Sequence, residues 1–137
     1  MCPRPKFFSS VSLLPTRGDW SAPICRDYEI VRVNSREILI SKAISEGGWQ
    51  TMIDRYFLTA FCVQEPYILL EGIETADTFL SDSERNARQL AYYAIDTTDD
   101  SIIGPFETAS SLLASLNLDT IDWTPITDPP NLPNVRY

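Results

Sequence analysis

The strongest periodic signal in the sequence is an apolar stripe that follows a pair of glycines. After Gly47-Gly48, apolar residues recur at alternating steps of three and one: Trp49, Met52, Ile53, Tyr56, Phe57, Ala60 and Phe61. That spacing places all seven side chains on one face of an α-helix, so it predicts an amphipathic helix over residues 49–61. Because a large apolar stripe is the ordinary way a helix packs on a sheet, we interpret it as core and not as a ligand pocket.

Other segments have the composition of β-strands. Residues 28–33 and 37–41 are rich in β-branched side chains and flank a short polar segment, which predicts a β-hairpin. The apolar run at 67–70 predicts a short buried strand. A polar turn at 97–100 separates residues 91–96 from 101–106 and predicts a second hairpin. Residues 87–95 also fit the extension of a preceding helix, and we favour the hairpin because paired tyrosines suit strands better.

Two further helices are indicated. Ser81-Asp82-Ser83-Glu84 matches a capping box and predicts a helix from there to about Gln89. Apolar residues at 109, 112, 113 and 116 keep helical spacing, with Thr108 able to cap the start and Asn117 able to end the helix. The sequence therefore predicts an α+β fold, in which two to three helices pack a small, mostly antiparallel sheet made of two hairpins and the short buried strand.

One hydrophobic core is expected. The 137 residues have the length of one domain, and 44% of them are hydrophobic, as in globular proteins. Prolines without clear periodicity mark an irregular arm over residues 1–26 and an extended, acidic, proline-rich tail over 118–137. Residues 27–117 are then the single α+β domain.

The sequence predicts a cytoplasmic protein. Its apolar runs are only a few residues long, whereas a membrane-spanning helix needs roughly 20, and its N-terminus lacks the sustained apolar region of a secretory signal. Cys2, Cys25 and Cys62 are odd in number and widely spaced, so they indicate neither a disulfide framework nor a zinc site. Reduced thiols in a reducing compartment fit this pattern.

The absence of histidine is the strongest functional constraint. Ser-His, Cys-His and histidine-metal chemistry all use an imidazole as base or ligand, and the chain has none. No glycine-rich segment leads to a Lys-Ser or Lys-Thr pair, so the usual phosphate-binding loop is also missing. We therefore expect a protein that is not an enzyme and needs no cofactor.

Charge divides the chain into two halves. The formal net charge is -8, but residues up to Val63 carry +2 and those from Gln64 onward carry -10. A field of that sign repels nucleic acid and anionic lipid and speeds encounter with basic surfaces. The expected partner is therefore a basic protein, with no direct contact to nucleic acid or to a membrane.

These observations lead to a hypothesis of protein binding. The chain is expected to be a small acidic inhibitor, of the immunity or anti-defence type, that masks a basic surface of a nuclease or another nucleic-acid-binding protein. Trp123 either anchors that interface or folds back to close the protein's own core, and the residues leave both open. The candidate contact residues are the acids of the second half and this tryptophan: Glu71, Glu74, Asp77, Asp96, Asp99, Asp100, Asp119, Asp122 and Trp123.

Two alternatives stay open. Asp96, Asp99 and Asp100 crowd one turn and could hold a divalent cation through oxygen ligands, or Glu71 and Asp96 could form the carboxylate pair of an enzyme. Aspartates are also ordinary turn formers, because their side chains bond nearby backbone amides. The other alternative is a structural assembly subunit, a homo-oligomer whose proline-rich arms reach onto neighbouring copies.

Overall fold

Nine strands form one sheet in the computed structural model, which describes residues 19–34, 37–44, 47–53, 56–74, 89–127 and 130–137. The elements in chain order are β1 (Trp20–Cys25), β2 (Tyr28–Asn34), β3 (Glu37–Ala43), β4 (Trp49–Ile53), β5 (Tyr56–Gln64), β6 (Tyr67–Glu74), β7 (Leu90–Asp96), β8 (Ser101–Phe106), α2 (Ala109–Leu116) and β9 (Thr124–Pro125). No helix within the described ranges is long and apolar enough to cross a membrane.

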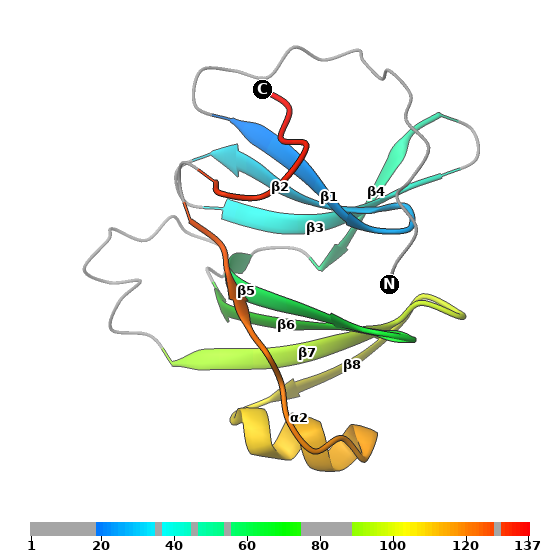
Figure 1. The fold of residues 1–137 in the computed structure, drawn as a ribbon, viewed down its shortest axis with the longest axis vertical. Coiled ribbons are helices and arrows are strands. Elements are labelled where there is room, and N and C mark those ends of the chain that lie inside the picture. The colour runs from blue at the N-terminus through cyan, green and yellow to red at the C-terminus, as the bar shows by residue number, and fades with distance from the viewer. Residues whose placement is uncertain (1–18, 35–36, 45–46, 54–55, 75–88, 128–129) are drawn as a thin grey trace.

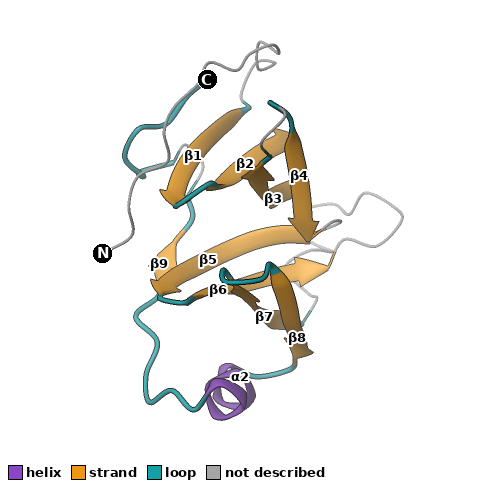
Figure 2. Ribbon diagram, turned by 90° about the vertical axis from the view of Figure 1, so that its right-hand side faces the viewer, coloured by secondary structure: helices purple, strands orange, loops and turns teal. Residues whose placement is uncertain are grey.

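The sheet bends into an upper and a lower half (Figure 1). Strands β1 to β4 form the upper half and β5 to β8 the lower half, in the order β1-β2-β3-β5-β6-β7-β8 with β4 paired to β3. Neighbouring strands are antiparallel except at the junction, where β3 and β5 meet in parallel at Ile38 and Phe57. β9 pairs with β5, and α2 lies below the lower half (Figure 2).

Two apolar clusters stabilise this arrangement. The main core is shared by both halves, because it contains buried residues of β1, β2 and β3 together with residues of β5, β6 and β7. The smaller core lies on the other face of the lower half, where Leu112 of α2 packs with Cys62, Leu69 and Ala94. The strands β5, β6 and β7 therefore pack one face against the upper half and the other against α2 and the segment after it.

The prediction of a helix over residues 49–61 is wrong. The predicted α+β class, with two to three helices packed on the sheet, is wrong as well. These residues form β4 and β5, and α2 is the single named helix of the described residues. Tyr56 and Leu58 alternate into the main core, but Thr59 is an extra residue opposite β6, so the next core position is Phe61. The apolar stripe therefore joins residues of two separate strands, and only its step from Phe57 to Ala60 crosses the β-bulge.

Several other sequence predictions are confirmed. β2 pairs antiparallel with β3, β7 pairs antiparallel with β8, and the run at 67–70 lies in the buried part of β6. The side chain of Thr108 caps α2 by accepting from the backbone N–H of Ser111, and Asn117 ends the helix in a left-handed conformation. Turn chemistry and capping are local properties, which is why these elements could be predicted.

Parts of the N-terminal half differ from expectation or lie outside the described residues. The arm predicted over 1–26 contains the strand β1, and its residues 1–18 lie outside the described part of the chain. The helix predicted from the capping box at Ser81 to about Gln89 also lies outside the described residues, except for Gln89.

Cys25 is disulfide-bonded, whereas Cys62 is a free, buried thiol. The expectation of reduced thiols is therefore wrong for Cys25, because cysteine spacing alone does not report which residues come together in space. A cytoplasmic location stays a prediction.

The C-terminal segment crosses both halves of the sheet (orange to red in Figure 1). After β9, the N–H of Ile126 donates to the carbonyl of Thr59, and Arg136 exchanges two backbone hydrogen bonds with Ser21 of β1. The Arg136 guanidinium donates to both carboxylate oxygens of Glu29 at 2.8 Å. Because Glu29 is only 3% exposed, this contact supplies the counter-charge of a buried acid.

Arg136→Ala is expected to lower the free energy of unfolding by roughly 3 kcal/mol, because it leaves the buried Glu29 carboxylate without its cation. Urea denaturation followed by circular dichroism measures the change. Arg26→Ala is the matched control, since its partner Glu65 is exposed, and it should cost less than about 1 kcal/mol. Equal losses in the two variants would contradict this role of Arg136.

A glycine in β8 permits a second bulge. Gly104 and Pro105 lie opposite the single residue Tyr93, between the pairs Tyr92–Phe106 and Ala94–Ile103. Gly104 has φ +124, and a Cβ at this position would lie 2.8 Å from the carbonyl oxygen of Tyr92. Both the backbone conformation and the close approach therefore require glycine.

Gly104→Ala should destabilise the protein by about 1 to 3 kcal/mol, since the new methyl group meets backbone in a conformation that L-residues avoid. Thermal unfolding would report it as a lowered Tm. Gly48→Ala serves as control, because its Cβ would make an ordinary 3.4 Å contact with Ile44. A Gly104→Ala variant as stable as Gly48→Ala would show that the bulge tolerates a side chain.

Candidate functional site

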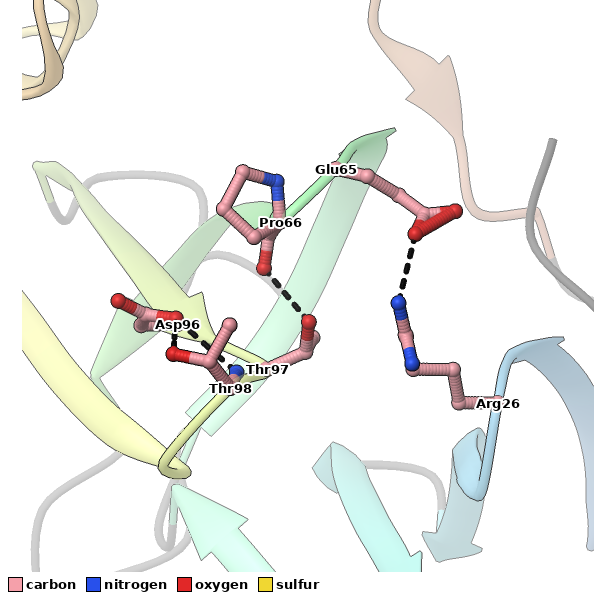
Figure 3. A network of polar contacts seen from close by, with 6 residues as sticks. All are labelled: Arg26, Glu65, Pro66, Asp96, Thr97 and Thr98. Atoms are coloured by element: carbon pink, nitrogen blue, oxygen red, sulfur yellow. Dashed lines mark hydrogen bonds and ion pairs between the residues drawn. The ribbon is translucent and has the colours of Figure 1, made fainter.

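Three turns meet at one end of the sheet (Figure 3). The side chain of Arg26, after β1, donates to Glu65 in the β5–β6 turn at 2.8 Å. The backbone N–H and the hydroxyl of Thr97, in the β7–β8 turn, both donate to the carbonyl of Pro66. The Arg26–Glu65 contact connects the upper half to the lower half, and the Thr97–Pro66 hydrogen bonds join two turns of the lower half.

The predicted acidic triplet lies in this turn cluster, but each aspartate has its own partner. Asp96 accepts from the backbone N–H and the hydroxyl of Thr98, and Asp99 accepts from the backbone N–H of Ser101. Asp100 instead extends to the upper half, where it accepts from the Tyr28 hydroxyl and from the Lys42 ammonium. The first two acids shape the turn, and the third joins the halves.

The environment of Asp100 favours its charged form. Burial opposes ionisation, but the hydrogen bonds from Lys42 and Tyr28 and the charge of Lys42 together hold the pKa of Asp100 below its ordinary value. Burial, followed by the hydrogen bond to Asp100, raises the pKa of the Tyr28 phenol far above its usual range. The hydroxyl therefore stays protonated and donates to the carboxylate.

The divalent-cation hypothesis finds no support in this geometry. Within the described part of the chain, no three acidic or cysteine side chains are arranged to hold a metal ion. The Glu71 and Asp96 pair also fails the spacing of a glycosidase. Glu71 faces Tyr92 on β7, and Asp96 lies four residues farther on, about 13 Å at 3.3 Å per residue, whereas the paired carboxyls lie within about 10 Å.

Asp100→Asn should make the free energy of unfolding depend less on pH in the acidic range. A carboxyl whose folded pKa lies below its ordinary 3.8 stabilises the protein above that pH, and the contribution is lost as the pH falls through the folded pKa. Asparagine keeps the left-handed backbone conformation of this residue, φ 62, and removes the charge together with one of the two acceptor oxygens. Urea unfolding should show a loss of about 1 to 3 kcal/mol at pH 7 and a smaller loss at pH 3. A loss of equal size at both pH values would contradict the prediction.

A second polar group of side chains lies on the outer face of the lower half. Glu71 of β6 is directly opposite Tyr92 of β7 and is hydrogen-bonded to it, and the Thr59 hydroxyl donates to the Glu71 carboxylate at 2.7 Å. The Tyr92 ring contacts the Trp123 ring, with centroids 6.0 Å apart and planes tilted by 45°. Phe106 pairs with Tyr92 from β8. We call Thr59, Glu71, Tyr92, Phe106 and Trp123 the outer-face cluster.

Both bulges of the lower half border this cluster. Thr59 is the extra residue of β5 beside Glu71, and its displacement aims the hydroxyl at that carboxylate while its carbonyl binds the C-terminal segment. The bulge at Gly104 and Pro105 adjoins the Tyr92–Phe106 pair. Bulges re-aim side chains and are common beside functional sites, so two of them around one group single this cluster out.

No cation of the described residues forms an ion pair with Glu71 in this cluster. Burial raises the pKa of Tyr92, and the charge of Glu71 and the hydrogen bond to it raise it further. Glu71, Tyr92 and Trp123 are each half-buried, so the group is partly covered and partly accessible. The arrangement can offer a negative charge beside aromatic surface, which suits the binding of a cation.

The sequence-predicted contact residues divide between separate places. Glu71 and Trp123 come together through Tyr92, and the exposed Asp119 and Asp122 lie on the segment that leads to Trp123. Asp96, Asp99 and Asp100 lie in the turn cluster, Glu74 is exposed at the far end of β6, and Asp77 lies outside the described residues. The nine predicted residues therefore do not form one continuous patch.

Sequence reasoning missed three members of the cluster, Thr59, Tyr92 and Phe106. Tyr92 was assigned to a hairpin but given no role, because its place beside Glu71 depends on the pairing of β7 with β6, which the hairpin does not imply. Thr59 could not be found, because its position depends on a bulge that the apolar pattern hides. Trp123 packs with its own chain, and its partial exposure leaves it available to a partner as well.

Every cationic side chain of the described residues forms an ion pair within the protein. Arg26, Arg32, Lys42 and Arg136 pair with Glu65, Asp19, Asp100 and Glu29, respectively. Nine acids of the described ranges have no described cation within ion-pair distance: Asp27, Glu37, Glu71, Glu74, Asp96, Asp99, Glu107, Asp119 and Asp122. Seven of these nine lie in the second half of the chain, so the acidic field is not neutralised by the described fold.

Comparison with protein-family models, curated proteins and solved structures finds nothing that this chain matches.

Proposed function

We propose that this protein is a non-enzymatic binding module that recognises a basic surface on another protein. It acts as an inhibitor, by masking the surface with which a nuclease or other nucleic-acid-binding protein holds its anionic substrate. The observation that carries the proposal is the separation of charges, in which each described cation is paired inside the fold and seven carboxylates of the second half are left without one.

Two further observations support a protein as the partner. The exposed acids Glu107, Asp119 and Asp122 adjoin a half-buried tryptophan and phenylalanine in the chain, and aromatic anchors beside steering charges are typical of protein interfaces. Nucleic acid and anionic membranes would be repelled by the same carboxylates. A carboxylate enzyme is less well supported, since the three turn aspartates are hydrogen-bonded to separate partners.

Affinity capture from the lysate of the protein's own host, at low and high salt, tests the proposal. We expect a basic protein in stoichiometric amount at low salt, released as salt screens the charges. Once purified, that partner should lose binding to nucleic acid when an equimolar amount of this protein is added.

Charge reversal then identifies the surface. Asp119→Lys/Asp122→Lys should slow association with the captured partner by about tenfold. Asp27→Lys/Glu37→Lys changes the net charge equally on the other half of the chain and should have a much smaller effect. Capture of no basic protein would overturn the proposal, as would a partner whose association rate is the same with both charge-reversed variants and the unmodified protein.

A further inference from the structure

We propose that the outer-face cluster binds an arginine side chain of the basic partner, with Glu71 as the counter-charge and the rings of Tyr92 and Trp123 as the surface on which the guanidinium lies. This inference rests on the proposed function and names the contact at its centre. It follows from three features of the cluster: the hydrogen bonding of Glu71, the ring geometry and the surrounding charge.

Glu71 has hydrogen-bonding capacity left for a ligand. Its donors are two neutral hydroxyls, those of Thr59 and Tyr92, which orient the carboxylate without neutralising it. An ionised carboxylate has about four lone-pair positions, so two further donors can be accepted. Because Thr59 and Tyr92 fix the side chain from neighbouring strands, little conformational entropy is lost when a cation binds.

The two rings supply the remaining surface. Tyr92 and Trp123 contact one another at a tilt of 45° and are both half-buried, so each ring is held in place by the fold and exposes part of its area. A cation near the face of an aromatic ring is attracted by the ring quadrupole, most strongly by tryptophan. A guanidinium is planar, so it can stack on a ring and still donate two hydrogen bonds to a carboxylate, whereas a lysine ammonium cannot.

Charge complementarity selects a cation over other side chains. None of the four described cations pairs with Glu71, and the acids next to the cluster in the chain, Glu107 and Asp122, add to the negative field. An aliphatic side chain would bury the carboxylate without compensation, and an acidic side chain would be repelled. Arginine is therefore the partner side chain that satisfies both the rings and the charge.

Titration with an arginine hexapeptide and a lysine hexapeptide tests the inference, with binding measured by calorimetry and the tryptophan indole signals followed by NMR. We expect arginine to bind more tightly than lysine and to shift the Trp123 indole signal but not that of the exposed Trp49. Glu71→Gln, which retains the Thr59 and Tyr92 hydrogen bonds, should weaken arginine binding by about tenfold. Its control Glu74→Gln, three residues along β6, should change binding by less than about twofold.

Trp123→Phe keeps a ring in the packing position and should weaken arginine binding, whereas Trp49→Phe should not; circular dichroism verifies that all four variants fold. Salt-sensitive binding that falls equally in Glu71→Gln and Glu74→Gln would overturn the inference and leave the proposed function standing. Absence of salt-sensitive binding to either peptide would count against the proposed function itself, and the arginine site would fall with it.

Discussion

The strand β5 makes the hydrogen bonds on which the rest of the structure depends. It pairs with β6 along most of its length, with β3 of the upper half at one end and with β9 of the C-terminal segment in its middle. Side chains of β5 also contribute to both apolar cores. The extra residue Thr59 shifts the side-chain alternation, so that Phe61 faces the core between the halves while Cys62 faces α2.

The sequence predicted the elements that depend on residues close together in the chain and missed the contacts that depend on how the strands pair. Hairpins and the helix α2 depend on turn and capping residues next to one another in the chain, and both hairpins and the cap at Thr108 were predicted correctly. The segment 49–61 was misassigned because apolar residues of two strands, the second with a bulge, happen to fall at helical spacing. Two residues of the candidate site, Glu71 and Trp123, could be selected from the sequence by residue type. That both contact Tyr92 depends on the register of the sheet and on the path of the C-terminal segment.

Polar contacts also decide how the halves are held together. The junction between β3 and β5 is a single parallel pair, so the shared apolar core is supplemented by ion pairs and hydrogen bonds between segments distant in sequence. Asp100 joins the β7–β8 turn to Tyr28 and Lys42, Arg26 joins Glu65, and Arg136 returns to Glu29. These links use three of the four described cations. The ion pairs that stabilise the fold therefore also leave few described cations to balance the acids on its surface.

The contrast between Asp100 and Glu71 shows how neighbours decide what a carboxylate does. Both lie in the lower half and accept a tyrosine hydroxyl, but Asp100 also meets an ammonium group, whereas the second donor of Glu71 is the Thr59 hydroxyl. A cation that is paired with a carboxylate offsets its negative charge, so the carboxylate attracts a ligand only weakly. The ion pair instead stabilises the folded state. A carboxylate oriented by neutral hydroxyls has no counter-charge among the described residues, so a binding partner can supply one.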